Sequence, residues 1–420
     1  MRAGDADGRP PPLMVGDLRT WRWAVSDEAA PLRALVRPGM GPGAITALRE
    51  RWSAEQVAVV SELVAARAKA ISKFPERAEN LAADREGVEM ASSARAAAYK
   101  AERFAEILGP GARVVDACCG IGGDAMAMVE AGLSVTAIDL DERRAWMAGF
   151  NAGCETLAAD VLAWSGDAAG IHADPSRRAG GQRTRAAEAF EPALTPLMGV
   201  VGRARVGAVK LHPGVDASSL PPGELEVISE GGRLTQAVLW TGGAAAHERR
   251  ATLLSRTGEV HTLAGPPERP YDANDVGAWV HTFDPSVERA DLVGLLIAAT
   301  GLALVHPGAG LLTGGEPCRS PWVTPFRVLE AAPWSLKGTR AMVRRLGAGE
   351  VVVKTRGGLV EPDRLSRELR GTGDRSIVLF VVRLGDRPVS IAAERAETTA
   401  PPDDAWSDGG TARSGLGGAS

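Results

Sequence analysis

A glycine-rich turn with a carboxylate on either side is the chemically most informative feature of this chain. Residues 113–124 read RVVDACCGIGGD, in which Asp116 follows a short run of β-branched residues and Asp124 follows the turn. A strand that breaks into a glycine turn and then a helix commonly forms the cradle of a nucleotide-like ligand. Between the two acids, the turn residues that we expect to contact such a ligand are Cys118, Gly120 and Gly122.

The charge of this turn distinguishes two classes of ligand. The spacing of Gly120, Gly122 and Ala125 also fits the dinucleotide pattern, with Asp139 as the ribose acid. A dinucleotide places its pyrophosphate at the helix N-terminus, where an acid at roughly 4 Å repels it by about 4 kcal/mol at an effective dielectric of about 20. S-adenosylmethionine has no phosphate and carries an ammonium and a sulfonium, which acids attract. We predict a methyl-donor site, with a dinucleotide site as the alternative.

Acidic residues also end the next two predicted strands. Asp139 is followed by Leu140, and Asp160 is followed by Val161. Ligands in open α/β sheets bind outside the carboxyl ends of the strands, where Asp139 can accept both ribose hydroxyls. Asp160 can accept a hydrogen bond from the adenine amino group, while an apolar neighbour covers the ring. We expect all four residues to contact the donor.

A D-P-S-R-R turn after the fourth predicted strand is the candidate site for the methyl acceptor. Methyl transfer is an in-line displacement on an activated carbon, so the protein mainly aligns the acceptor and removes its proton. Pro175 fixes the turn, and Asp174 can hold or deprotonate an acceptor. Arg177 and Arg178 can hold a phosphate or stack on a base. These four residues, and Lys210 at the end of the fifth predicted strand, are the catalytic candidates.

Alternating strands and helices predict a doubly wound α/β domain. A capping box at Ser53 and Gln56 begins one predicted helix, and an alanine-rich helix is expected from Ser93 to Leu108. Strands are expected at 113–117, 134–138, up to 160, 170–173, 206–211, 225–229 and 234–240. Together they predict a mostly parallel, Rossmann-like sheet of seven strands, with the last pair forming a hairpin at its edge.

Composition divides the chain into six expected regions. Polar ends predict disorder, and the proline-rich stretch 265–271 predicts a boundary, beyond which a helix is expected over 285–300. FRVLE, EVVVK and SIVLFVVRL are then expected as strands of a smaller α+β module. The expected regions are a disordered N-terminus (1–16), a helical segment (17–105), the S-adenosylmethionine-binding core (106–262), a linker with a connecting helix (263–320), the basic module (321–394) and a disordered tail (395–420).

Charge is distributed unevenly along the chain. The net charge is −4, but residues 319–387 hold 14 basic and 7 acidic side chains, which leaves +7 there and −11 elsewhere. A basic module on an acidic core is expected where the module binds a polyanion, and a solvated arginine-rich surface is the alternative. The residues proposed to contact the polyanion are Lys337, Arg340, Arg344, Arg345, Lys354 and Arg356.

Cysteine content and hydropathy predict what the protein lacks. The four cysteines form no C-x-x-C pair, so neither a disulfide scaffold nor a metal site is expected. The chain has no apolar run long enough to cross a membrane, and its polar start does not resemble a secretory signal. We expect a cytoplasmic protein without membrane contact.

The motifs now placed resemble those of the class I S-adenosylmethionine-dependent methyltransferases. More narrowly, DREGVEMASS, DACCGIGGD, ADPSRR, VKLHPGVD and WSLKGTRAMVRRLGAGEVVVKTRG look like the bacterial family that pairs this core with a C-terminal THUMP-like domain. The resemblance covers about residues 50–394. Because THUMP domains of RNA-modifying enzymes bind tRNA, it implies an RNA substrate, either tRNA or rRNA.

The leading hypothesis is therefore an S-adenosylmethionine-dependent RNA methyltransferase. The sheet rim would hold the donor, the D-P-S-R-R turn would align a nucleotide, and the basic module would position the RNA. Two alternatives stay open. One is a small-molecule methyltransferase whose C-terminal module is structural, and the other is a non-catalytic RNA-binding adaptor.

Overall fold

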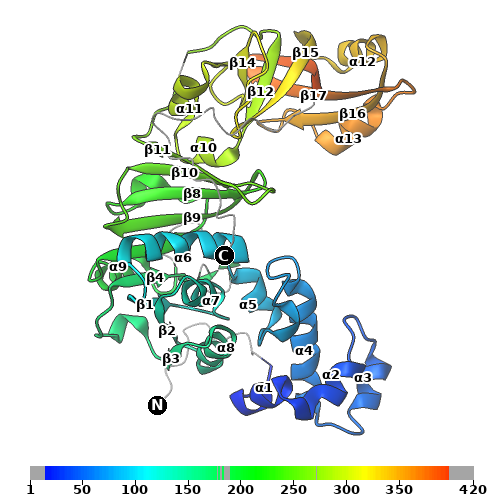
Figure 1. Cartoon of the computed structure of the whole chain (residues 1–420). Coiled ribbons are helices and arrows are strands. Elements are labelled where there is room, and N and C mark those ends of the chain that lie inside the picture. Colours follow the sequence, from blue (N-terminus) through cyan, green and yellow to red (C-terminus); the bar gives the residue numbers. More distant parts are fainter. Residues whose placement is uncertain (1–14, 177, 180–181, 184–189, 271, 397–420) are drawn as a thin grey trace, which may run out of the picture. The chain divides into compact units, whose positions relative to one another are not determined.

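Two compact units make up the chain. The computed structural model describes residues 15–176, 178–179, 182–183, 190–270 and 272–396 (Figure 1). The units are Met1–Leu211 with Ser218–Pro221 and Leu239–Ala244, and His212–Ala217 with Pro222–Val238 and Ala245–Ser420. Both ends predicted to be disordered lie almost entirely outside the described residues.

A helical segment precedes the sheet of the first unit. Its helices are α1 (Leu18–Val25), α2 (Ala30–Leu35), α3 (Pro42–Leu48), α4 (Ala54–Ala70) and α5 (Arg85–Met90). The capping box predicted at Ser53 and Gln56 is present and begins α4. Apolar side chains of α1, α2 and α4, among them Trp21, Leu32 and Leu63, form one core that also includes Ile121 of the glycine turn. The segment is thus packed against the region where the donor site is expected.

Five parallel strands form the centre of the first unit. They are β1 (Arg113–Ala117), β2 (Ser134–Asp139), β3 (Glu155–Ala158), β4 (Gly170–Ala173) and β7 (Val206–Leu211). Strand β1 lies between β2 and β4, β3 pairs with β2, and β7 pairs with β4, all in parallel. Their carboxyl ends therefore share one edge of the sheet, as predicted.

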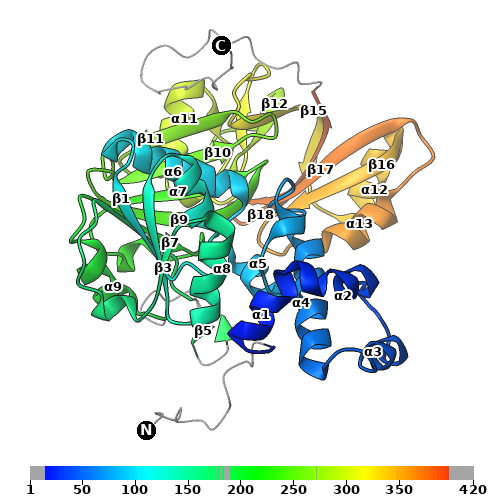
Figure 2. The same cartoon turned by 60° about the horizontal axis from the view of Figure 1, so that its bottom comes forward.

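Helices cover both faces of these strands. They are α6 (Ala94–Leu108), α7 (Gly123–Glu130), α8 (Glu142–Ala152) and α9 (Leu194–Val201). Helices α6, α7 and α8 lie side by side (Figures 1 and 2). A side chain at Gly170 would touch Phe104 of α6, whereas one at Gly207 would touch Val201 of α9. Since Gly170 is in register with Val206, Gly207 points to the opposite face, so α6 and α9 cover different faces.

The predicted sheet is present but continues further than predicted. Strands β8 (Glu224–Glu230) and β9 (Arg233–Gly242) correspond to the last two predicted strands, and β10 (Arg249–Leu254) and β11 (Val260–Gly265) are additional. The order is β11-β10-β8-β9-β7-β4-β1-β2-β3, so nine strands are found among the described residues instead of seven. Gly231 and Gly232, both with positive φ, join β8 to β9 as predicted.

The prediction that this hairpin ends the sheet is wrong. Strand β10 pairs in parallel with β8, and β11 pairs antiparallel with β10. Strand β10 begins with Arg249 and Arg250, and most residues of β11 are only half-buried, so neither segment shows a simple apolar alternation. The hydrophobic pattern therefore did not reveal them.

A second sheet fills most of the second unit. Its strands are β12 (Trp279–Phe283), β13 (Ala303–Leu304), β14 (Leu312–Gly314), β15 (Val323–Pro333), β16 (Ala348–Thr355), β17 (Arg375–Leu384) and β18 (Arg387–Arg395), in the order β13-β14-β12-β15-β18-β17-β16. The predicted strand motifs FRVLE, EVVVK and SIVLFVVRL fall within β15, β16 and β17. The segment 263–320, expected as a linker with one helix, supplies β12, β13 and β14 to the same sheet.

Helices α10 (Pro285–Arg289), α11 (Val293–Thr300), α12 (Leu336–Arg345) and α13 (Pro362–Leu369) complete the second unit. The single helix predicted over 285–300 is two helices, because Asp291 between them has a φ of 60°. Met342 of α12 and Leu365 of α13 pack with Val353 and Leu379 of the sheet. The two helices thus share a hydrophobic core with β16 and β17.

Candidate functional site

A cavity of about 750 Å³ opens at the carboxyl ends of the first unit's strands. This volume is within the usual range of small-molecule sites, roughly 300–1,000 Å³. The predicted site residues that line it are Asp116, Cys118, Gly120, Asp124, Asp139, Leu140, Asp160, Val161 and Asp174. The structure therefore brings residues from four strand ends and the glycine turn to one place.

Gly122, also predicted to contact a ligand, packs against a helix instead. A Cβ atom at Gly122 would lie 2.7 Å from the Cα of Ala148 in α8, and its φ is 81°. Gly120, with a φ of 55°, has no atom within 4 Å of such a Cβ and borders the cavity. Gly122 allows the turn to pack closely on α8, where a side chain would clash. Gly120 allows the backbone to adopt a positive φ at the cavity wall.

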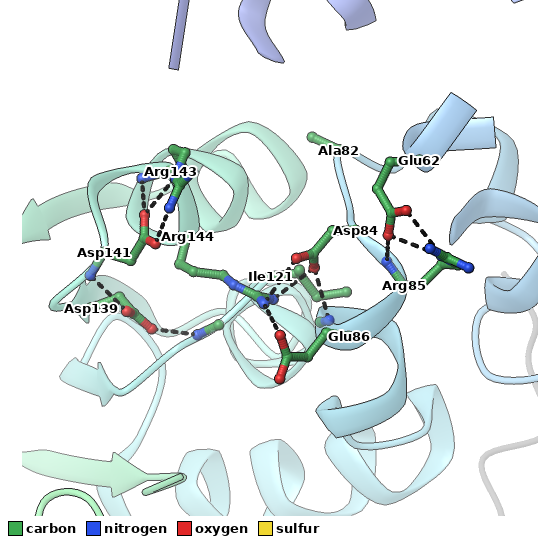
Figure 3. A network of polar contacts seen from close by, with 12 residues as sticks. Glu62, Ala82, Asp84, Arg85, Glu86, Ile121, Asp139, Asp141, Arg143 and Arg144 are labelled. Carbon is green, nitrogen blue, oxygen red and sulfur yellow. Dashed lines mark hydrogen bonds and ion pairs between the residues drawn. The ribbon is translucent and has the colours of Figure 1, made fainter. Parts of the chain in front are cut away.

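Asp139 holds the glycine turn to the end of β2. Its Oδ2 accepts a hydrogen bond from the Gly120 amide and its Oδ1 accepts one from the Asp141 amide, both at 3.0 Å (Figure 3). Burial raises the pKa of Asp139, and these two amides act in the opposite direction. Leu140 beside it is 78% exposed, which leaves a large apolar side chain at the mouth of the cavity.

Asp160 and Val161 form the corresponding corner at the end of β3. The Asp160 carboxylate accepts a hydrogen bond of 2.9 Å from the Leu162 amide and thereby caps the short 3-10 helix Val161–Ala163. Val161 is buried at the cavity wall. A carboxylate and an apolar side chain thus stand together, as the predicted adenine contact requires.

A buried polar cluster lies behind the glycine turn. His172 of β4 is 2.7 Å from Asp116 through Nδ1 and 3.2 Å from the Lys100 ammonium through Nε2. Lys100 of α6 is 2.6 Å from Oδ1 of Asp124 and donates to the Ser92 hydroxyl, which donates to Oδ2 of Asp124. All five residues are buried. The cluster joins α6, α7, β1 and β4 directly beneath the cavity.

Sequence reasoning did not find Lys100 or His172 as site residues. One signal was available for Lys100, because it stands on the same helical face as Ala96, Ala97 and Phe104, which are all buried. A lysine on such a face needs a buried anion, since an unpaired buried charge is very costly. No comparable spacing signal identifies His172.

The two acids of the cluster are shifted in opposite directions. Burial raises the pKa of Asp116, and the hydrogen bond from His172 only partly opposes it. Burial is the largest influence on Asp124 and acts to raise its pKa, but the nearby Lys100 ammonium and other neighbouring groups together outweigh it and lower the pKa of Asp124. Burial and the surrounding carboxylates raise the pKa of Cys118, so its thiol is neutral near pH 7. The cavity wall therefore presents an anionic carboxylate at Asp124 beside a neutral thiol.

Helix α5 forms another wall of the cavity and is held at both ends. Asp84 caps it by accepting from the Gly87 amide at 2.8 Å and pairs with Arg144 of α8 at 2.9 Å (Figure 3). A Cβ atom at Gly87 would clash with the Arg144 guanidinium, so glycine permits this contact. At the other end, the Lys210 ammonium donates to the Met90 carbonyl at 3.0 Å. Sequence reasoning missed Arg144 and Met90 as cavity residues.

The predicted acceptor turn lies at the end of β4. Lys210 forms an ion pair of 2.6 Å with Asp174 and is almost completely buried. Pro175 is buried, and the backbone of Ser176 pairs with that of Glu191. Arg177 lies outside the described residues. Arg178 begins the short strand β5 (Arg178–Ala179), paired with β6 (Gln182–Arg183), and its side chain is not described.

The basic residues predicted to bind a polyanion divide into two groups. Arg340, Arg345 and Arg356 form ion pairs with glutamates at 3.6, 2.6 and 2.6 Å. Lys354 lies over the Phe326 ring, 5.4 Å from its centroid, and burial lowers its pKa. Lys337 and Arg344 are exposed on α12, with no ion pair among the described residues.

Within the described ranges, no cluster of three or more histidine, cysteine or acidic side chains is arranged to hold a metal ion. None of the described helices is both long and apolar enough to span a membrane. The cavity is lined by carboxylates, two arginines, two thiols and apolar side chains.

Comparison with known proteins identifies relatives of both parts of the chain. Residues 323–395 match the family model described as THUMP domain-like. Two Mycobacterium tuberculosis proteins, from strains CDC 1551 and H37Rv, are each 31% identical over 313 residues, covering 71% of this chain and 84% of their own. Both are named uncharacterized S-adenosylmethionine-dependent methyltransferases.

A crystal structure of a Porphyromonas gingivalis W83 protein described as a methyltransferase has the same fold. It matches with a TM-score of 0.70 at 20% identity and covers 91% of this chain and 100% of that chain. The sequence relatives answer the choice between dinucleotide and methyl donor in favour of the donor. The chain belongs to the S-adenosylmethionine-dependent methyltransferases.

Proposed function

We propose that this enzyme transfers a methyl group to a nucleotide of RNA, either tRNA or rRNA. The observation that carries the proposal is the joining, in one chain, of a carboxylate-lined donor cavity and a THUMP-like domain. THUMP-like domains suggest RNA modification, and a cytoplasmic RNA is the expected substrate.

The residues of the cavity fit S-adenosylmethionine. Asp116 borders the cavity, and its Oδ2 is buried and has no hydrogen-bond partner among the described residues, so Asp116 suits the ammonium of the methionine part. Asp139 is proposed to hold the ribose, and Asp160 the adenine amino group. Leu140 and Val161 would cover the adenine ring. When bound, the donor supplies a methyl group activated by its sulfonium.

Asp174 is the proposed acceptor-binding residue. Its carboxylate can only accept hydrogen bonds when ionised, so it suits an N–H group of a nucleobase. Lys210 holds it at 2.6 Å and is itself fixed by the Met90 carbonyl. Asp174 would orient the acceptor and take its proton, Pro175 would fix the turn, and Arg177 and Arg178 would hold a phosphate or stack on a base.

Lys337 and Arg344 are the strongest candidates for contact with the RNA body. Both are exposed on α12, and their side chains are not committed to ion pairs within the described residues. Arg340, Arg345 and Arg356 would have to exchange a glutamate for a phosphate, and Lys354 is partly held against Phe326. We therefore propose a primary role for the first two residues and a secondary role for the other four.

Incubation of the full chain with labelled donor and total bacterial RNA, followed by nucleoside mass spectrometry, tests the function. The wild type should produce one methylated nucleoside. Asp174→Asn should lower kcat by at least about a hundredfold and leave donor affinity nearly unchanged, since it removes a general base but keeps the shape. Lys210→Met should act in the same direction. Equal losses of donor affinity and turnover in Asp174→Asn would contradict the division of roles.

A small-molecule methyltransferase is the second candidate, and one observation favours it. Three of the six predicted RNA-contacting residues are paired with glutamates of the second unit, as expected of a structural module. Replacing Lys337 and Arg344 together by glutamate distinguishes the candidates. RNA binding should weaken and its dependence on salt should decrease if these residues contact phosphates. Unchanged binding and salt dependence would favour the small-molecule substrate.

A further inference from the structure

We propose that Lys100, His172 and Ser92 are positioning residues that hold Asp116 ionised and aimed at the ammonium of the donor. This inference rests on the proposed placement of the donor in the cavity. It assigns a role in donor binding to three side chains that belong to α6, β4 and the segment before α6. None of the three borders the cavity itself.

The hydrogen-bond partners of the cluster define one consistent arrangement of protons. A lysine ammonium can only donate, so Nε2 of His172, at 3.2 Å, must accept from Lys100. The neutral imidazole then carries its hydrogen on Nδ1 and donates it to Oδ1 of Asp116 at 2.7 Å. Oδ1 of Asp116 is then engaged as an acceptor, and this hydrogen bond favours the ionised form of Asp116 against the burial that raises its pKa. His172 therefore bridges Lys100 and Asp116, so the position of Lys100 determines how the Asp116 side chain is oriented.

The second oxygen of Asp116 is the one left without a partner. Oδ2 is buried and has no hydrogen-bond partner among the described residues, while Asp116 lies on the cavity wall. Free rotation of the side chain is prevented because His172 holds Oδ1. A buried carboxylate oxygen without a partner is costly, and a cationic ligand group at this position removes the cost.

The charge of the cluster points to the same ligand. Asp116 and Asp124 supply two negative charges, Lys100 supplies one positive charge, and His172 is neutral in this arrangement. A net charge of −1 therefore remains in a buried cluster that borders the cavity through Asp116 and Asp124. A primary ammonium, which brings one positive charge and donates hydrogen bonds, neutralises it.

Ser92 fixes the far end of this cluster. Its hydroxyl accepts from Lys100 at 3.1 Å and donates to Oδ2 of Asp124 at 3.0 Å. Lys100 is therefore held on three sides, by Ser92, Asp124 and His172. Its ammonium cannot move to Asp116 and form a direct ion pair without breaking these contacts. The arrangement keeps Asp116 available to the ligand while His172 orients it.

Two nucleosides test the inference by calorimetric titration of the full chain. S-adenosylhomocysteine carries the amino-acid ammonium, and 5′-methylthioadenosine has the same adenosine and thioether but lacks it. His172→Leu should weaken S-adenosylhomocysteine about tenfold to a hundredfold, the contribution of one charged hydrogen bond, and change methylthioadenosine less than about twofold. Asp116→Asn should show the same selectivity. His172→Asn, whose amide can donate to Asp116, should recover part of the loss.

Leu140→Ala is the matched control, since an apolar wall residue should affect both nucleosides alike. Melting temperature and circular dichroism establish that each variant is folded. Equal loss of both nucleosides in His172→Leu would overturn the positioning role and leave the donor site intact. Binding of neither nucleoside by the folded wild type would overturn the donor site itself, so the two failures are distinguishable.

Discussion

Replacement of Lys100 by methionine should destabilise the first unit strongly at neutral pH. Lys100 is completely buried and lies 2.6 Å from Asp124. Methionine has a similar length, so the loss of packing should be below about 1.5 kcal/mol. The remaining buried carboxylates would lack their cation, and breaking a buried pair in this way costs about 3–5 kcal/mol. We expect the unfolding midpoint of this unit to fall by roughly 6–20 °C.

The pH dependence of this loss follows from the pKa of Asp124. In the wild type, Lys100 lowers that pKa, so the stability from ionised Asp124 is present above its ordinary range and is lost as pH falls through the lowered pKa. Without Lys100, burial dominates and raises the pKa of Asp124. The variant should therefore regain stability as pH falls, because protonation removes the unpaired charge. Its difference from wild type should be largest near about pH 8 and smaller near about pH 4.5.

Thermal unfolding of wild type, Lys100→Met, Asp124→Asn and the double variant at both pH values tests this reasoning. The double variant should recover a large part of the stability that Lys100→Met loses, since neither charge remains. Equal losses at the two pH values, or simple additivity of the two single substitutions, would refute the account of the buried pair.

Three further predictions concern the glycine turn, the proposed ribose-binding acid Asp139 and the thiol of Cys154. Gly122→Ala should lower the unfolding midpoint far more than Gly120→Ala. A Cβ atom at Gly122 would lie 2.7 Å from Ala148, whereas one at Gly120 would add only backbone strain of about 1 kcal/mol. Similar midpoints for the two variants would contradict this. Asp139→Ala should lower the affinity for S-adenosylhomocysteine, measured by calorimetry, at least about tenfold. Asp139→Asn, whose side chain still accepts a hydrogen bond, should lower that affinity less. Identical losses of affinity in the two variants would argue against a role of the carboxylate. Burial raises the pKa of Cys154 to about 11, so its alkylation by iodoacetamide should still accelerate above about pH 9, and a plateau there would contradict the burial.

The donor side of the site could be predicted because each residue follows a strand in sequence. Asp116, Asp139 and Asp160 come directly after or at the end of apolar runs, and the parallel topology places those ends at one edge. The glycine turn carries its own signal in the spacing of Gly120 and Gly122. The local sequence pattern and the rule that ligands bind at the carboxyl ends of parallel strands were therefore sufficient to predict the donor side of the site.

The supporting contacts could not be predicted because they join distant parts of the chain. His172 is 72 residues from Lys100, and Lys210 is 120 residues from the Met90 carbonyl that it contacts. Neither pairing has a periodic signature. The same holds for the pairing of β10 with β8, in which the exposed-looking arginines at the start of β10 conceal the strand. Such contacts depend on how elements far apart in the sequence pack against one another, and no local sequence pattern specifies that packing.

Calorimetric titration of the wild-type chain with S-adenosylmethionine and, separately, with NAD tests the central claim most directly. The claim is that a cavity lined by Asp116, Asp124, Asp139 and Asp160 binds a cationic nucleoside without phosphate. We predict saturable binding of S-adenosylmethionine at micromolar concentration and none of NAD. Saturable binding of NAD, with no heat from S-adenosylmethionine in the folded protein, would contradict it.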